Sequence, residues 1–298
     1  MTWEDVDWEL LARLRDRFLS PQSSGPDYWT SERVLEQYDF TFGQRIAWKW
    51  DAVLEDAAER GWRPPEAYAV VDWGCGTGVA SRRFIARFPS PGARSWPLDR
   101  SRLAQAWTAA HIPIPPAESI AGPFCLLVSH VALELSNADR GRLLELAERA
   151  HTIFWVEPGT PEAGRLLVQA RERLRKHLVP FAPCPHSSAC GLLAPERASD
   201  WCHHFAAPAP ETFTSAGWSV FSRRLGIDLR ALPVSYLAMT RDPLPPHAGR
   251  VLGRPRALKG RVEFLACREG GITDERVIRS RDRELHDRLA SGGFSLWL

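Results

Sequence analysis

The chain has 298 residues, of which 44% are hydrophobic and 25% charged, and this composition is ordinary for a folded protein of one large domain or slightly more. A net charge of +2 is too small to indicate a nucleic-acid partner, so that inference must rest on local clusters of charge. The acidic first seven residues lack the features of a signal peptide, and no apolar run reaches the roughly 20 residues of a membrane span. We therefore expect a cytoplasmic protein without membrane association, in which clustered cysteines hold metal more often than they form disulfides.

The first third of the chain predicts helices followed by a nucleotide-binding unit. Apolar residues recur at helical spacing in residues 3–62, with a break at 21–26 and an end at Gly61. Residues 68–72 form a short apolar strand that leads into a glycine-rich loop, and residues 79–88 have helical character. A strand, a loop and a helix in this order open a doubly wound parallel sheet.

The rest of the chain continues this alternation and then changes character. Further buried strands are predicted at 94–99, 124–129 and 152–157, with helices at 101–110, 138–150 and 161–178. Residues 180–210 have little periodicity, and strands at 234–239 and 261–267 make the remainder β-rich. We predict an α/β protein with four regions: an N-terminal helical region (1–62), a cofactor-binding domain (63–180), a cysteine-rich loop (181–210), and the end of the sheet with a small basic β-rich region (211–298).

The loop at 72–78 has the sequence Asp-Trp-Gly-Cys-Gly-Thr-Gly. Gly74, Gly76 and Gly78 allow a sharp turn and a close approach of a ligand to the backbone. The spacing is G-x-G-x-G behind an acid, which resembles motif I of class I S-adenosylmethionine (SAM) methyltransferases more than a pyrophosphate-binding loop. We expect Asp72 and the three glycines to bind the cofactor, and Asp99 to accept hydrogen bonds from its ribose. The other interpretation is a tight turn without a cofactor.

A catalytic group is less clearly marked. After the strand at 124–129, the chain reads Ser129-His130-Val-Ala-Leu-Glu134, where many base-nitrogen methyltransferases carry Asn or Asp before Pro-Pro and an aromatic residue. Ser129 is a candidate cofactor contact, and His130 or Glu134 is a weak candidate for the base or a substrate contact. Capping of the following helix explains His130 and Glu134 equally well.

Three cysteines lie within nineteen residues, and a fourth follows in the β-rich region. Cys184, Cys190 and Cys202 are in the irregular loop, and Cys267 is placed to complete their site from the next region. Thiolates favour zinc or an iron–sulfur cluster, and nearby histidines keep a mixed Cys/His zinc site open. The spacing differs from a C-x2-C zinc ribbon, so a cluster is the preferred interpretation; zinc and no metal are the others.

Taken together, these motifs resemble the Rsm22 family of small-ribosomal-subunit methyltransferase-like proteins, which includes methyltransferase-like protein seventeen and bacterial relatives. The resemblance is bacterial in type, and it covers most of the chain from about residue 40 onward. The matching stretches follow the family's order: residues 72–78, 156–161, 183–186 with Cys190, 200–203, 235–238 and 250–255. The resemblance implies a class I methyltransferase (Rossmann-like) fold with a metal-pinned C-terminal region, a 4Fe–4S cluster on Cys184, Cys190, Cys202 and Cys267, and association with small-subunit rRNA. The chain departs from the family by a second histidine after Cys202 and by Ala132-Leu-Glu134 in place of an Asn-Glu-Leu element.

A basic segment without an acid supports an RNA partner. It contains Arg250, Arg254, Arg256, Lys259 and Arg261, and we expect it to be a loop that contacts phosphates. Two functions fit these features. The first is a SAM-dependent methyltransferase, expected to be monomeric, that modifies small-subunit rRNA. The second is a non-catalytic assembly factor that binds rRNA and uses SAM and the metal site structurally.

Overall fold

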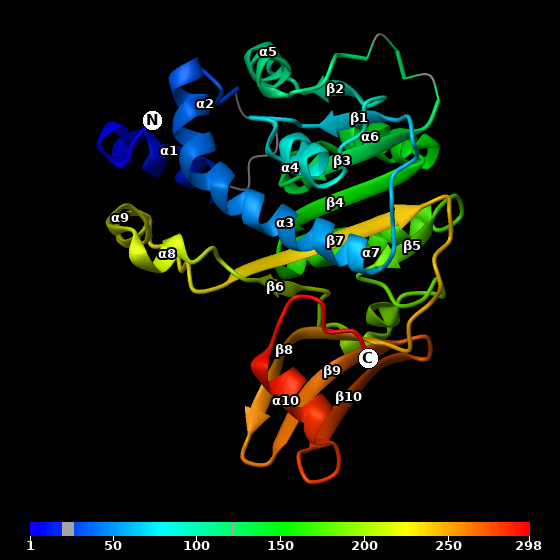
Figure 1. Cartoon of the computed structure of the whole chain (residues 1–298). Helices are drawn as coiled ribbons and strands as arrows, with labels where there is room; N and C mark the ends of the chain where they lie inside the picture. Colours follow the sequence, from blue (N-terminus) through cyan, green and yellow to red (C-terminus); the bar gives the residue numbers. More distant parts are fainter. Residues whose placement is uncertain (20–26, 118, 121) are drawn as a thin grey trace.

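In the described part of the chain, a seven-stranded sheet forms the centre of the protein (Figure 1). The computed structural model describes residues 1–19, 27–117, 119–120 and 122–298, so the break expected at 21–26 lies outside the described residues. The strand order is β2-β1-β3-β4-β7-β5, with β6 paired to β7. Strands β1 to β4 are mutually parallel, and β7 runs antiparallel to β4, β5 and β6. The strands are β1 (Ala69–Trp73), β2 (Arg94–Leu98), β3 (Phe124–Ser129), β4 (Thr152–Pro158), β5 (Val179–Ala182), β6 (His204–Ala206) and β7 (Leu232–Thr240).

Helices cover both faces of this sheet, which explains why its strands are continuous apolar runs. Leu127 and Phe154 face the side covered by α3 (Gln44–Glu59) and α4 (Val79–Arg87). Leu126 and Trp155 face the opposite side, where α6 (Asn137–Arg149) and α7 (Pro161–Leu174) pack. A further helix, α5 (Arg102–His111), contacts β2. The predicted α/β class with a mainly parallel sheet is confirmed, and it is consistent with a class I methyltransferase fold.

The N-terminal helices form a layer above one end of the sheet (Figure 1). They are η1 (Trp3–Asp5), α1 (Trp8–Leu19) and α2 (Glu32–Tyr38), and the π-helical turn η2 (Asp39–Gly43) joins α2 to α3. Trp3 lies against Trp8, Phe40 and Trp218, the last from α9 (Ala216–Leu225), which follows α8 (Glu211–Thr214). This aromatic cluster attaches the N-terminal layer to the segment before β7.

The C-terminal residues form a separate three-stranded antiparallel sheet of order β10-β9-β8, with α10 (Arg283–Ser291) on one face. Its strands are β8 (Arg250–Leu258), β9 (Arg261–Arg268) and β10 (Gly271–Ile278). The prediction of a loop at 250–261 is therefore wrong for most of that segment. Gly253, at φ +65°, and Pro255 interrupt the strand pattern at a bulge between Leu252 and Arg256. Because β8 is an edge strand, its ladder tolerates this proline.

Between the two sheets, the predicted irregular segment contains only short helical turns, η4 (Gly191–Leu193) and η5 (Pro195–Arg197), before β6. None of the described helices has the length and apolar character needed to cross a bilayer.

Candidate functional site

The glycine loop is a left-handed turn at the carboxyl end of β1. Gly74, Gly76 and Gly78 all have positive φ, at +71°, +51° and +75°. A Cβ on Gly74 would lie 2.9 Å from the Val131 side chain, and one on Gly78 would lie 2.7 Å from Thr108. At Gly74 and Gly78, both the backbone conformation and the lack of room for a Cβ therefore require glycine. The loop backbone is left open toward the carboxyl edge of the sheet.

Asp99 follows β2 and closes the other side of this loop. Its carboxylate accepts hydrogen bonds from the backbone N–H of Gly76 at 3.0 Å and of Ser101 at 2.9 Å. Asp72 has a different position: it is fully buried, and its Oδ2 accepts a 2.7 Å hydrogen bond from Ser81 on α4. Burial raises the pKa of Asp72 to about 6. Within the described chain, Asp72 and Gly78 support the loop from behind rather than line the cavity.

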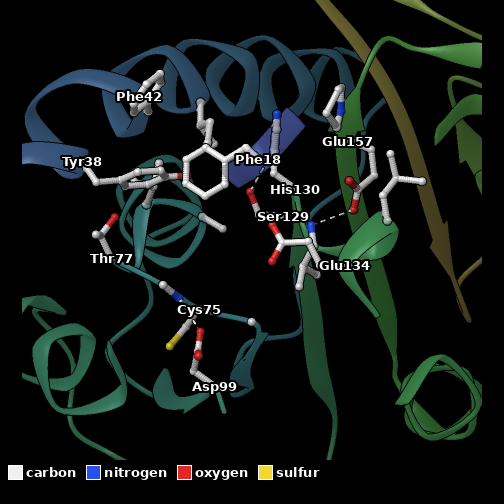
Figure 2. A pocket seen from close by; sticks show the side chains of 18 of the residues that line it. Phe18, Tyr38, Phe42, Cys75, Thr77, Asp99, Ser129, His130, Glu134 and Glu157 are labelled. Carbon is white, nitrogen blue, oxygen red and sulfur yellow. Dashed lines mark hydrogen bonds between the residues drawn. The ribbon is translucent and has the colours of Figure 1, made fainter. Parts of the chain in front are cut away.

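The loop opens into a chamber of about 760 Å³ that is shared by the sheet edge and the N-terminal helices (Figure 2). Gly74, Cys75, Gly76, Thr77 and Asp99 line one part of it. Aromatic side chains from α1, α2, η2 and the segment before α2 also line the chamber; the rings belong to Phe18, Tyr28, Trp29, Tyr38 and Phe42. Trp29 lies against the glycine loop, since a Cβ on Gly76 would be 3.3 Å from its ring. Thr77 Oγ1 is buried and has no hydrogen-bond partner among the described residues, which leaves a polar atom for a ligand. The volume lies within the range of small-molecule and cofactor sites.

Ser129 and His130 lie at the chamber where β3 ends. Ser129 Oγ accepts a 2.9 Å hydrogen bond from Trp50 Nε1 on α3. His130 has φ +53°, and its Nε2 lies 3.2 Å from Lys49 Nζ. Burial, followed by the charges of Lys49 and Arg45, lowers the pKa of His130 well below its usual value, so its imidazole is neutral.

Glu134 and Glu157 are the carboxylates nearest these groups (Figure 2). Glu134, on the turn η3 (Ala132–Glu134), accepts a 3.3 Å hydrogen bond from the Tyr28 hydroxyl. Glu157 is buried at the end of β4, and its Oε1 accepts hydrogen bonds from the N–H groups of Val131 and Ala132 and from Trp155 Nε1. Burial raises the pKa of Glu157 to about 7. Both carboxylates line the chamber, so a proton-accepting role is open to each.

The periodicity of residues 1–62 predicts helices and gives no role in the site to Arg45, Lys49 or the aromatic side chains that line the chamber. The signal was present in Trp48-Lys49-Trp50, where a lysine stands between two tryptophans in the middle of an apolar helix. Burial next to the sheet edge is what brings Lys49 to His130, and no local spacing indicates that contact.

The four predicted metal-ligating cysteines line one small cavity. Cys184, Cys190 and Cys202 come from the irregular segment, and Cys267 comes from β9 of the second sheet. A Cβ on Gly191 would lie 2.8 Å from Gly271, so the two segments meet at backbone distance beside Cys190. The fold therefore brings together residues that are up to 83 positions apart.

Arg171, a buried residue of α7, organises the cysteine segment. Its Nε lies 3.2 Å from Cys184 Sγ, and its Nη2 donates to the carbonyls of His186 at 3.0 Å and Ser188 at 2.8 Å. Burial raises the pKa of Cys190 to about 11, and the neighbouring Cys184 adds to this shift.

No single-ion site is formed in this region. Among the residues that the structure describes, no group of three or more His, Cys, Asp or Glu side chains stands close enough to hold one metal ion. His204 Nε2 lies 3.8 Å from Cys202 Sγ, and His186 Nε2 lies 3.8 Å from Cys267 Sγ. Each histidine thus approaches a different cysteine, and the histidines do not gather around one point.

The predicted RNA-binding residues divide into two sets. Arg254, Arg256, Lys259 and Arg261 are exposed on β8 and the turn to β9. Arg254 lies over the Phe205 ring at 4.3 Å, and Arg261 pairs with Glu263 at 2.7 Å. The segment is a strand with an exposed basic surface, rather than the expected loop.

The prediction that Arg250 contacts RNA is wrong, because its side chain is fully buried in the protein core. Its Nη1 lies 2.8 Å from Asp56 Oδ1 on α3, and its Nη2 donates to the Phe294 carbonyl at 2.7 Å. Asp56 also accepts hydrogen bonds from the Tyr236 hydroxyl and from Trp297 Nε1. Arg250 therefore cannot contact phosphate, and it joins the second sheet to α3 and the first sheet.

Comparison with known proteins gives three kinds of result. No match was found among curated proteins. Solved structures with a similar arrangement include PH1948 of Pyrococcus horikoshii, a proposed RNA methyltransferase (15% identity, 78% of this chain and 97% of that chain, TM-score 0.40). Others are the plantazolicin methyltransferase BamL with S-adenosylhomocysteine (12% identity, 79% and 100%, TM-score 0.37) and magnesium protoporphyrin IX methyltransferase of Synechocystis PCC 6803 with SAM (13%, 80% and 98%, TM-score 0.37).

The third result is a protein-family match that extends from within α3 to the end of α10 and so includes the glycine loop, the cysteine segment and the second sheet. Across residues 57–291, the chain belongs to the Rsm22 family, described as mitochondrial small ribosomal subunit Rsm22.

Proposed function

We propose that this protein is a SAM-dependent methyltransferase that acts on RNA of the small ribosomal subunit. The observation that carries the proposal is the junction of the glycine loop with Asp99 at the edge of the chamber. Open loop backbone, an acid at the end of the next strand and the unpartnered Thr77 Oγ1 fit a ligand with a ribose and an ammonium group. When bound there, SAM supplies an activated methyl group. Membership in a family described by the small ribosomal subunit supports the choice of RNA.

The test of this proposal is methyl transfer from radiolabelled SAM to small-subunit rRNA taken from cells that lack the protein. We expect incorporation with the native chain and loss of SAM binding in Asp99→Ala, because a charged hydrogen-bond acceptor contributes about 1.5–3 kcal/mol. This corresponds to roughly a 10- to 150-fold rise in Kd. Asp228→Ala, which changes an exposed acid, is the matched control and should bind SAM normally.

The second candidate function is a non-catalytic rRNA-binding assembly factor. The observation that favours it is the position of the exposed basic residues, which lie on the second sheet at the end of the molecule opposite α1 and α2 (Figure 1). RNA binding that survives Asp99→Ala, without any methyl incorporation by the native chain, would support this function. Saturable incorporation would support the first.

We further propose that Cys184, Cys190, Cys202 and Cys267 hold a 4Fe–4S cluster. A tetrahedral zinc site, with Zn–S of about 2.3 Å, needs its sulfur atoms roughly 3.8 Å apart. Cluster ligands bind separate irons and stand further apart. Four cysteines that line one cavity supply the number of ligands that such a cluster needs. Held there, the cluster would supply a cross-link between the irregular segment and β9.

Iron, sulfide and zinc analysis of protein purified without oxygen tests the metal assignment. We expect about four irons and four sulfides per chain. Zinc in place of iron would mean that the four thiols contract around one ion. Protein that contains neither iron nor zinc would contradict the metal-site assignment.

A further inference from the structure

The chamber has room for more than a cofactor, and its second half has a distinct chemistry. The cofactor side is formed by the glycine loop and Asp99. The other side lies beneath α1, α2 and η2, where the Phe18 ring makes edge contacts with Tyr38 and Phe42 at centroid distances of 5.8 and 5.9 Å (Figure 2). Aromatic walls of this kind stack flat, unpaired bases. Arg45 Nε, at the same side, is buried without a hydrogen-bond partner among the described residues.

One lysine lines this chamber, in a chain whose basic residues are nearly all arginines. Of the 38 basic Lys and Arg residues, only Lys49, Lys176 and Lys259 are lysines. Lys49 is 7% exposed and lines the chamber, whereas Lys176 and Lys259 are on the surface. Arginine stays protonated in proteins, but a buried lysine can release its proton and act as a base. Lys49 is therefore a basic residue of the chamber that, unlike an arginine, can exchange a proton near neutral pH.

The surroundings of Lys49 favour its neutral form. Burial and, to a smaller extent, the charge of Arg45 on the same helix lower the pKa of Lys49 to about 7, although Glu157 at the end of β4 opposes the shift. The remaining group that faces it is the neutral His130 imidazole after β3, whose Nε2 is 3.2 Å away. The positive φ of His130 directs its ring into this contact instead of along the strand.

We propose that the aromatic half of the chamber receives a single unpaired nucleobase, and that Lys49 is the catalytic residue that takes the proton released when the amino group of the base is methylated. The proposal rests on the proposed function. The exocyclic amino nitrogen of the base forms a bond to the methyl carbon as the carbon–sulfur bond breaks. The electron pair of the broken bond stays on sulfur, which gives S-adenosylhomocysteine. The N–H proton passes to the lone pair of Lys49 Nζ and then to solvent.

The first test needs no turnover. Trace labelling with acetic anhydride between pH 5 and 10, read by mass spectrometry, follows each of the three lysines separately. We expect Lys49 to become reactive near pH 7, with the surface residue Lys176 as the internal reference. S-adenosylhomocysteine with adenosine or cytidine monophosphate should protect Lys49 and leave Lys176 unchanged. Titration of Lys49 together with Lys176, or labelling that neither nucleotide affects, would overturn the proposal.

The second test compares Lys49→Met, Lys49→Arg and the surface control Lys176→Met in methyl transfer to small-subunit rRNA. Loss of a general base should lower kcat by about 10²- to 10⁴-fold in both Lys49 variants, with SAM affinity retained. In the native protein, kcat should rise through pH 7. Substantial activity in Lys49→Arg would show that a positive charge suffices, and transfer to ribosomal protein instead of RNA would refute the nucleobase. If the native chain transfers no methyl group, the proposed function fails, and the labelling experiment still decides the state of Lys49.

Discussion

The Asp56 carboxylate is a buried charge that must be neutralised for this fold to be stable. It has no exposed surface, and it is neutralised by Arg250, which is 194 residues away in the sequence. Burial alone would raise the pKa of Asp56, but the Arg250 charge and hydrogen bonds from Arg250 and Tyr236 outweigh burial and lower it. Since the folded-state pKa is lowered, this stabilisation is present above the unfolded pKa of about 3.9 and is lost as the pH falls below it.

Arg250→Met is therefore expected to lower the free energy of unfolding by about 3–5 kcal/mol at pH 7, because it leaves Asp56 charged and unpaired. Urea denaturation would measure the change. Arg254→Met, on the same strand but exposed, is the matched control and should change stability little. A double variant, Arg250→Met with Asp56→Leu, should recover much of the loss, since it removes both charges; no recovery would mean that the pair is not what stabilises this junction.

Glu157 has the opposite linkage between pH and stability. Its pKa is raised from 4.5 to about 7 by burial, so the folded protein keeps a proton that the unfolded chain releases. Ionisation therefore weakens the folded state as the pH rises from about 4.5 to about 7. Glu157→Gln should stabilise the protein by about 2–3 kcal/mol at pH 8 and by almost nothing at pH 4.5. Equal stabilisation at both pH values would contradict a protonated Glu157.

At the scale of elements, the strands and glycine loop followed directly from local pattern, whereas several site residues did not. Strand β3 was predicted with the bounds that the structure has, because its residues are apolar on both faces. Strand β8 was missed, because Gly253 and Pro255 hide an edge strand. The sequence pattern does not predict the site role of Lys49, because that role depends on His130, 81 positions away. It wrongly predicts an RNA contact for Arg250, whose partner Asp56 is 194 positions away. Charge alone cannot distinguish a phosphate contact from a buried ion pair.

The exposed face of β8 makes a quantitative prediction about RNA. Arg256 and Lys259 are exposed, whereas Arg261 is partly neutralised by Glu263. Each lost phosphate contact should reduce the slope of log K against log salt by about 0.7 to 0.9. Arg256→Gln with Lys259→Gln should therefore flatten the slope by roughly 1.4 to 1.8. Arg261→Gln should flatten it by less than the roughly 0.7 to 0.9 expected for one full phosphate contact. Filter binding of small-subunit rRNA from 50 to 300 mM salt measures this; an unchanged slope would remove β8 from the interface.

At the scale of the whole molecule, the cysteine site and the Asp56–Arg250 pair join the same two sheets at different points. Carbonyls of the irregular segment also accept hydrogen bonds across this junction: Gly253 N–H donates to the His203 carbonyl at 2.9 Å, and His247 N–H donates to the Pro185 carbonyl at 3.0 Å. The second sheet is thus held by a proposed metal site, a buried ion pair and backbone hydrogen bonds.

If the proposed metal site is correct, Cys267→Ser should release its metal and lower the Tm of the whole chain in one transition, because metal binding adds to folding free energy and the two sheets share contacts. Cys125→Ser, a buried cysteine far from the site, is the control for losing a thiol and should keep its metal. Two separate melting transitions in Cys267→Ser would show that the second sheet folds independently, and this would contradict the junction described here.

The Asp56–Arg250 pair also constrains the order of events during synthesis. Asp56 leaves the ribosome with α3, long before β8 has been translated, and until then Tyr236 of β7 can donate to its carboxylate but the neutralising charge of Arg250 is missing. The proposed metal site likewise cannot form on Cys184, Cys190 and Cys202 until Cys267 has been translated. A nascent chain stalled before residue 250 should therefore remain open to proteases and to holding chaperones, although nearly all of the first sheet has been made. We therefore expect the core to be completed only after β8 has been made, so that the final sixth of the polypeptide, residues 250–298, decides when the rest becomes stable.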